Sequence, residues 1–188
     1  PSDSHTFIRR EIEALERCGT VVVRLSIRGW ELPLVDGDDL NERQLTRYVL
    51  KGGAMPLLSS FLRIGLLRPR LMLGSFTLAF QRWKDSDRPL LVHLAYVIEA
   101  CRVVQLLEAD SVQHLHAHFC TNSAEVAMQC HQLGGPPYSF TAHGSDLMDK
   151  PTLMGLDLKI SRAKFAVAVC SYGLSQIYRW IPHSDWKK

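Results

Sequence analysis

Half of the eight histidines in the chain stand in two short stretches, VQHLHAHFCTNS and YSFTAHGSDL. His114, His116 and His118 occupy alternate positions of the first stretch, and His143 follows an apolar run in the second. A neutral imidazole can hydrogen-bond a substrate, transfer a proton near neutral pH or bind a transition metal. The spacing therefore indicates a substrate cleft or a metal site. The alternative is that the clustering is an accident of composition.

The elements that would position these histidines alternate in type along the second half of the chain. We expect strands at 112–119, 138–143 and 165–170, each followed by a helix, at 121–133, 155–163 and 171–181. Such alternation predicts an α/β fold with a doubly wound, Rossmann-like parallel sheet and right-handed crossovers. Ligands of these sheets bind beyond the carboxyl ends of the strands, where His116, His118 and His143 fall.

The N-terminal stretch SHTFIRREIEALERCG predicts a helix that ends at Gly19, and Thr20 to Ile27, TVVVRLSI, predicts a buried strand. A strand normally precedes the first helix of a parallel α/β sheet, but here the helical pattern begins almost at once. We therefore expect that the first strand is missing and that residues 1–188 are a single domain, a fragment of a longer protein.

The middle of the chain predicts a helical excursion from the sheet. Leu40 to Leu50 reads as an amphipathic helix, residues 55–84 as a helical hairpin that breaks near Pro69, and Arg88 to Asp110 as a long apolar helix on the sheet. Between Asn41 and Lys84, eight basic residues stand against one acidic residue, which leaves this region at about +7.

Composition places the chain among soluble globular proteins, with 46% hydrophobic residues, 22% charged residues and a net charge of +3. Its five cysteines are an odd number and form no Cys-x-x-Cys motif, which favours reduced thiols in the cytoplasm. We find no run of about 18 apolar residues, the length that a membrane span requires. Aromatic residues are not interleaved with the basic ones, so we expect no nucleic-acid partner.

Four stretches, SDSHTFIRREIEAL, HLHAHFCTNSAEVA, YSFTAHGSDL and FAVAVCSYGLSQ, carry a resemblance to a known family. In order and spacing they resemble the N-terminal half of retaining glycosyltransferases of the GT-B fold, most of all the colanic acid and exopolysaccharide type of glycosyltransferase family 4. The resemblance covers nearly the whole chain. It implies an acceptor-binding Rossmann-like domain, whose C-terminal partner domain would hold the nucleotide-sugar donor and a pair of glutamates.

The resemblance also implies roles for particular residues. His143, in TAHGSD, is the candidate catalytic residue, placed in the cleft near the sugar and the reacting acceptor. The remaining candidates would bind substrate at the same rim of the sheet: His118, Gly144, Ser145, Asp146, Thr6, Ser4 and Asn122. Family members of this type need no metal and no cofactor in the active site, because the nucleotide sugar is a co-substrate. The acceptor would be a polysaccharide or a lipid-linked saccharide, and the fragment alone would be inactive.

Two other readings stay open. If the first histidine strand continues, His114, His116, His118 and Cys120 share one face and could hold the zinc ion of a hydrolase, with His143 and Asp146 joining from the next strand. The basic hairpin, rich in leucine, could instead lie on an anionic membrane surface as a non-catalytic binding module. That surface is also compatible with a glycosyltransferase that works at the inner face of the cell membrane.

Overall fold

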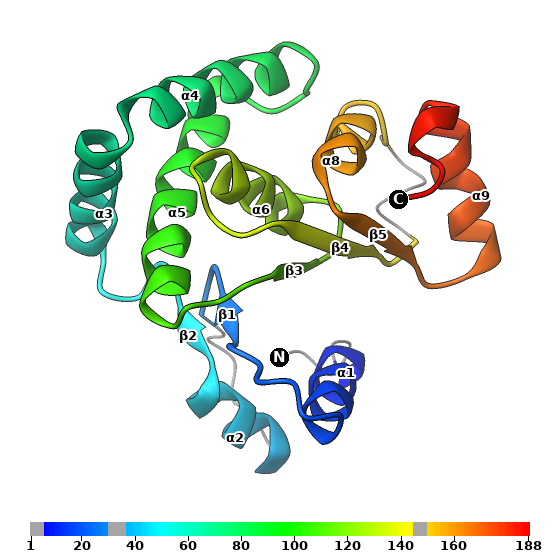
Figure 1. The fold of residues 1–188 in the computed structure, drawn as a ribbon, viewed down its shortest axis with the longest axis horizontal. Coiled ribbons are helices and arrows are strands. Elements are labelled where there is room, and N and C mark those ends of the chain that lie inside the picture. Colours follow the sequence, from blue (N-terminus) through cyan, green and yellow to red (C-terminus); the bar gives the residue numbers. More distant parts are fainter. Residues whose placement is uncertain (1–5, 30–36, 145–149) are drawn as a thin grey trace. The chain divides into compact units, whose positions relative to one another are not determined.

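The computed structural model describes residues 6–29, 37–144 and 150–188, drawn in colour in Figure 1. Three of the candidate site residues, Ser4, Ser145 and Asp146, lie outside the described residues. The fold is α/β, as the sequence predicts, with two small parallel sheets. Backbone contacts divide the chain into two compact units, Pro1–Gly53 and Ala54–Lys188. The expectation that residues 1–188 act as a single domain stays a prediction.

The first unit pairs two helices with two very short strands. Its elements are α1 (Thr6–Arg17), β1 (Leu25–Ser26), α2 (Gly37–Leu45) and β2 (Arg47–Tyr48). The strands run parallel, with Leu25 opposite Arg47 and Ser26 opposite Tyr48. Arg24 connects α1 and α2, because its guanidinium donates to Glu16 at 2.8 Å and to Glu42 at 2.7 Å. These partners raise the pKa of Arg24.

Two sequence predictions fail in this unit. Thr20 to Ile27 is not a buried strand, since only Leu25 and Ser26 are paired and Val21 is 91% exposed. A strand needs a partner along its length, and β2 offers just two residues. The helix predicted to reach Leu50 ends at Leu45, because the β-branched and aromatic residues that follow favour extended backbone. Val49 and Leu50 then continue the pairing, as their N–H groups donate to Ser26 and Ile27.

The second unit contains the larger sheet and most of the helices. Its elements are α3 (Ala54–Leu67), α4 (Pro69–Lys84), α5 (Leu90–Ala109), β3 (Leu115–His118), α6 (Asn122–Gln132), β4 (Tyr138–Ala142), α8 (Leu156–Arg162), β5 (Phe165–Ala168), α9 (Ser171–Trp180) and a 3-10 turn, His183–Asp185. The predicted hairpin is confirmed, and it breaks where proline begins α4. The three strand–helix pairs of the second half are confirmed as well.

The long helix α5 bears on the expectation that the chain has no membrane span. Within the described residues, Leu90–Ala109 is the one helix whose length and mean hydropathy, 1.7, would allow it to cross a membrane. It packs mainly on α6, α3 and α4, and 44% of its apolar window is buried. The core helix of a soluble protein has the same length and composition, so this feature is weak evidence for a span.

The sheet of this unit is parallel, in the order β3-β4-β5. His116 lies opposite Ser139 and His118 opposite Thr141 in the β3–β4 register. Because side chains alternate across a strand, one face carries the histidines and the other carries apolar residues. The apolar face forms the core with α6 and α8, which Figure 1 shows together on one side of the sheet: Ala117, Phe140, Ala142, Ala124, Met128, Leu156 and Ile160 are buried there.

Candidate functional site

A ladder of hydrogen-bonded side chains lies on the histidine face of β3 and β4. His114 Nε2 contacts Ser139 Oγ at 2.7 Å, and the same oxygen contacts His116 Nδ1 at 2.7 Å. His116 Nε2 then contacts Thr141 Oγ1 at 2.9 Å. We call these residues, with His118 and His143, the histidine ladder. Hydroxyl groups therefore contact both ring nitrogens of His116, which indicates a structural role for this residue.

Two imidazoles of the ladder, those of His114 and His116, are neutral at neutral pH. Burial lowers the pKa of His116 from 6.5 to about 4, and the nearby His114 and His143 act in the same direction. The pKa of His114 is lowered too, chiefly by burial and further by Lys164. A neutral imidazole donates through one nitrogen and accepts through the other, which matches the two hydroxyl partners of His116. Proton donors and acceptors therefore alternate from His114 through Ser139 and His116 to Thr141 at neutral pH.

The carboxyl-terminal end of the ladder is a pair of histidines from neighbouring strands. His118 Nδ1 and His143 Nε2 are 3.3 Å apart, and their rings are tilted by 32°. Phe119 packs against His143 at 4.7 Å between ring centroids and has a positive φ of 71°. This turn ends β3, and it is held where the Ser123 hydroxyl donates to the carbonyl oxygens of His118 and Phe119. Both imidazoles are thereby presented where the strands end.

The structure brings together two of the candidate residues, His118 and His143. Gly144 follows directly, and its φ of +97° is a conformation that L side chains rarely adopt, which accounts for glycine at this position. Asn122 lies elsewhere, because its side chain faces Tyr96 on the helix-covered side of the sheet. Thr6 begins α1 of the first unit. Its substrate-binding role, like that of Gly144 and Asn122, stays a prediction.

The four-residue zinc set is not formed. The strand ends at His118, and Cys120 is buried in the apolar core, 1% exposed, away from the histidine face. The set required the strand to continue through Cys120, and the positive φ of Phe119 prevents this. His116 also has both nitrogens occupied by hydroxyls. Asp146, the further ligand considered, lies outside the described residues.

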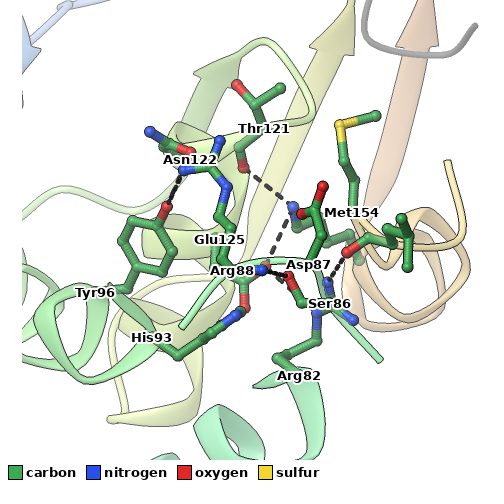
Figure 2. A pocket seen from close by; sticks show the side chains of 12 residues that line it. Arg82, Ser86, Asp87, Arg88, His93, Tyr96, Thr121, Asn122, Glu125 and Met154 are labelled. Carbon is green, nitrogen blue, oxygen red and sulfur yellow. Dashed lines mark hydrogen bonds and ion pairs between the residues drawn. The ribbon is translucent and has the colours of Figure 1, made fainter. Parts of the chain in front are cut away.

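A second polar cluster, which sequence reasoning missed, lies on the other side of the sheet (Figure 2). A cavity of about 30 Å³ opens between the end of α4, the starts of α5 and α6, and the segment before α8. Its floor carries four buried ionisable side chains, none more than 4% exposed: Arg82, His93, Glu125 and Lys159. We call this cavity and its lining the ion-pair pocket.

Glu125 is the centre of the floor. Its Oε2 lies 3.2 Å from Lys159 Nζ and 3.5 Å from Arg82 Nε. Lys159 completes its bonding by donating to the carbonyl oxygens of Cys120 at 2.8 Å and Thr121 at 3.0 Å, at the start of α6. Burial lowers the pKa of Lys159, and Glu125 opposes this shift. The paired charges therefore connect α4, α6 and α8 on the helix-covered side of the sheet.

The guanidinium of Arg82 packs closely against Gly155. Arg82 Nη2 donates to the carbonyl oxygen of Leu153 at 3.0 Å. A Cβ atom on Gly155 would fall 2.2 Å from Arg82 Cζ, and the φ of Gly155, +63°, is again left-handed. Glycine is thus required here both by backbone conformation and by the close approach of the guanidinium.

The mouth of the pocket is polar as well. Arg88 Nη1 donates to Tyr96 Oη at 3.0 Å, and the Tyr96 hydroxyl donates to Asn122 Oδ1 at 2.9 Å. Asp87 pairs with Lys150 at 2.8 Å, and this hydrogen bond lowers the pKa of Asp87. One sequence signal could have revealed the cluster: Glu125 and Lys159 stand inside the helical patterns AEVA and LDLKIS at positions that a core-facing stripe reserves for apolar residues.

Comparison with models of known protein families, with curated proteins and with solved structures yields no match to this chain.

Proposed function

We propose that the chain is the acceptor-binding part of a retaining GT-B glycosyltransferase of the colanic acid and exopolysaccharide type in family 4. The observation that carries the proposal is the His118–His143 pair, at the carboxyl ends of neighbouring parallel strands. Ligands of parallel α/β sheets bind at that edge. The finer fold, a doubly wound sheet, belongs to the same proposal.

The pair suits carbohydrate chemistry. Imidazole can accept a hydrogen bond from a sugar hydroxyl, donate one, or take up the proton that an attacking hydroxyl loses. In the proposed reaction a hexose passes from a nucleotide sugar to a saccharide or lipid-linked acceptor with retention at the anomeric carbon. His143 would contact the reacting acceptor, while His118 would orient His143 through the 3.3 Å contact. The second domain of the parent enzyme would hold the donor and stabilise its departing diphosphate.

The experiment begins with the gene around this reading frame. Transfer of labelled hexose from a panel of nucleotide sugars is then measured on the complete protein. We expect His143→Ala to lower kcat by about a hundredfold or more, the typical contribution of a general acid–base group. His114→Ala is the matched control and should keep activity, because that residue lies at the far end of the ladder. Near-normal turnover of His143→Ala would make this histidine structural.

We also propose that the hairpin α3–α4 approaches an anionic membrane, the site of lipid-linked acceptors. Four exposed apolar side chains on α3 follow each other at three- and four-residue spacing: Met55, Leu58, Leu62 and Leu66. Such a stripe is the pattern of an interfacial helix, and the exposed Arg63 and Arg70 add positive charge beside it. Two other arginines do not contribute, since Arg68 pairs with Glu108 and Arg82 is buried.

Flotation with phosphatidylglycerol vesicles tests the membrane proposal, which places the protein in the cytoplasm at the inner face of the membrane. We expect the chain to float with these vesicles and the variant Leu62→Glu/Leu66→Glu to stay in the soluble fraction. Leu91→Glu, at an exposed leucine of α5, is the matched control and should float. Equal flotation of both variants would leave the stripe without a membrane role.

A further inference from the structure

The ion-pair pocket contains buried polar atoms that the protein itself does not satisfy. Among the described residues, Glu125 Oε1 and both ring nitrogens of His93 lack a hydrogen-bond partner, and Arg82 Nε has only its 3.5 Å ion pair with Glu125 Oε2 and no hydrogen bond. The three side chains are 3%, 2% and 3% exposed, and all line the cavity (Figure 2). A buried polar atom without a partner is costly, so native proteins rarely keep one without a bound water, ion or ligand. The cavity is therefore a site for a small polar guest.

The charges around the cavity favour an anion. Arg82, Lys159 and the exposed Arg88 line it, and Glu125 is the one buried carboxylate among its lining residues. The exposed Asp87 is neutralised by Lys150. The start of α6 adds to this balance, because Thr121 and Asn122 line the cavity and the Thr121 side chain makes no capping bond. Unpaired N–H groups at a helix start attract anions.

Glu125 imposes a further condition on that anion. A carboxylate accepts hydrogen bonds and donates none, so a fully ionised oxyanion next to Oε1 would be repelled. An oxyanion that carries a proton would instead donate its O–H to Oε1 while its other oxygens accept from Arg82 Nε, Arg88 or the α6 N–H groups. Inorganic phosphate keeps at least one O–H at neutral pH, whereas sulfate keeps none.

We propose that the ion-pair pocket binds phosphate in a protonated form and discriminates against sulfate. The inference is independent of the proposed glycosyl transfer, because the pocket lies on the helix-covered side of the sheet and the histidine pair on the other. The phosphate group could come from inorganic phosphate or from a phosphomonoester. The two sources share the chemistry of the site, and the measurement below separates them.

Titration calorimetry of the 188-residue chain at pH 6 tests the proposal with inorganic phosphate, sulfate and glycerol 3-phosphate, at matched ionic strength. At this pH a phosphomonoester is also partly protonated. We expect phosphate to bind at least about tenfold more tightly than sulfate, the effect of one misplaced hydrogen bond to a charged group. Binding of glycerol 3-phosphate as tight as that of phosphate would assign the site to an ester, and weaker binding would assign it to the free ion. Equal binding of phosphate and sulfate, or binding of neither, would overturn the proposal.

The variant Glu125→Gln sharpens the test. A carboxamide can donate to an unprotonated oxygen, so the preference for phosphate over sulfate should fall by about tenfold. If this variant does not fold, Arg88→Ala replaces it, because Arg88 is exposed at the mouth and its loss should weaken phosphate binding by about tenfold. Arg70→Ala is the matched control and should bind phosphate unchanged. A preference that survives Glu125→Gln, or binding indifferent to Arg88→Ala, would contradict the site.

Discussion

The histidine ladder and the ion-pair pocket place polar side chains on opposite faces of one three-stranded sheet, and they neutralise them by different means. In the ladder, His116 is neutral, because burial lowers its pKa to about 4 and two hydroxyl groups form hydrogen bonds with the neutral ring. In the pocket, Glu125 and Lys159 both stay within ion-pair distance, 3.2 Å. A titratable group that can become neutral at physiological pH is cheap to bury, whereas a carboxylate and an ammonium are buried together.

The largest effect is expected from breaking the ion pair. Lys159→Met leaves Glu125 with a buried charge and a single, longer contact to Arg82, and should cost about 3–5 kcal/mol of unfolding free energy. Urea denaturation measures the loss. Lys164→Met, an exposed lysine just after α8, is the matched control. The double variant Lys159→Met/Glu125→Leu should recover part of the loss, since it removes both charges. If Lys159→Met is as stable as the wild type, the ion pair does not stabilise the pocket, and the contrast between the two regions is wrong.

A smaller, pH-dependent effect is expected in the ladder. The pKa of His116 is about 4 in the folded chain and 6.5 when it is unperturbed. The unfolded chain therefore binds a proton that the folded chain refuses, so His116 costs stability as the pH falls from 6.5 towards 4, by up to about 1.4 kcal/mol per pH unit. Above pH 6.5 the contribution of the neutral ring is complete.

The variant His116→Gln separates this term from the other histidines. At pH 8 it should be less stable than the wild type by about 1 kcal/mol, the worth of a lost hydrogen bond. The difference should shrink or reverse at pH 4.5, because glutamine takes up no proton. Denaturation midpoints at the two pH values measure this change. A constant difference would mean that His116 has the same pKa in the folded and the unfolded chain.

The smallest stability effect is expected at the end of the ladder. His143 is only partly buried, and its contact with His118 is a long one, 3.3 Å. His143→Ala should change the free energy of unfolding by less than about 1 kcal/mol, the range of a partly exposed hydrogen bond. Combined with lost activity in the complete enzyme, this result would divide the ladder into a structural His116 and a functional His143. If His143→Ala lowers the free energy of unfolding by more than about 2 kcal/mol in urea denaturation, His143 is structural as well.

Much of the second unit could be predicted from local patterns. Three apolar runs, each followed by a helical pattern, are enough to define β3 to α9, because strand and helix periodicity are properties of neighbouring residues. Alternation along LHAH likewise places His116 and His118 on one face. Near the N-terminus the same reasoning failed for Thr20 to Ile27, since β-branched residues become a strand only where a partner strand exists.

By itself, then, the sequence determined the α/β class, the helical hairpin and the histidines at the strand ends, all of which follow from short-range periodicity. Tertiary structure alone decided which polar groups meet. Ser139 becomes the partner of His114 and His116 through the register of two strands. The charges of Glu125 and Lys159 stand 34 positions apart in the chain and become neighbours only when α6 and α8 pack on the same face. Long-range contacts depend on how elements assemble, and no local pattern records that assembly.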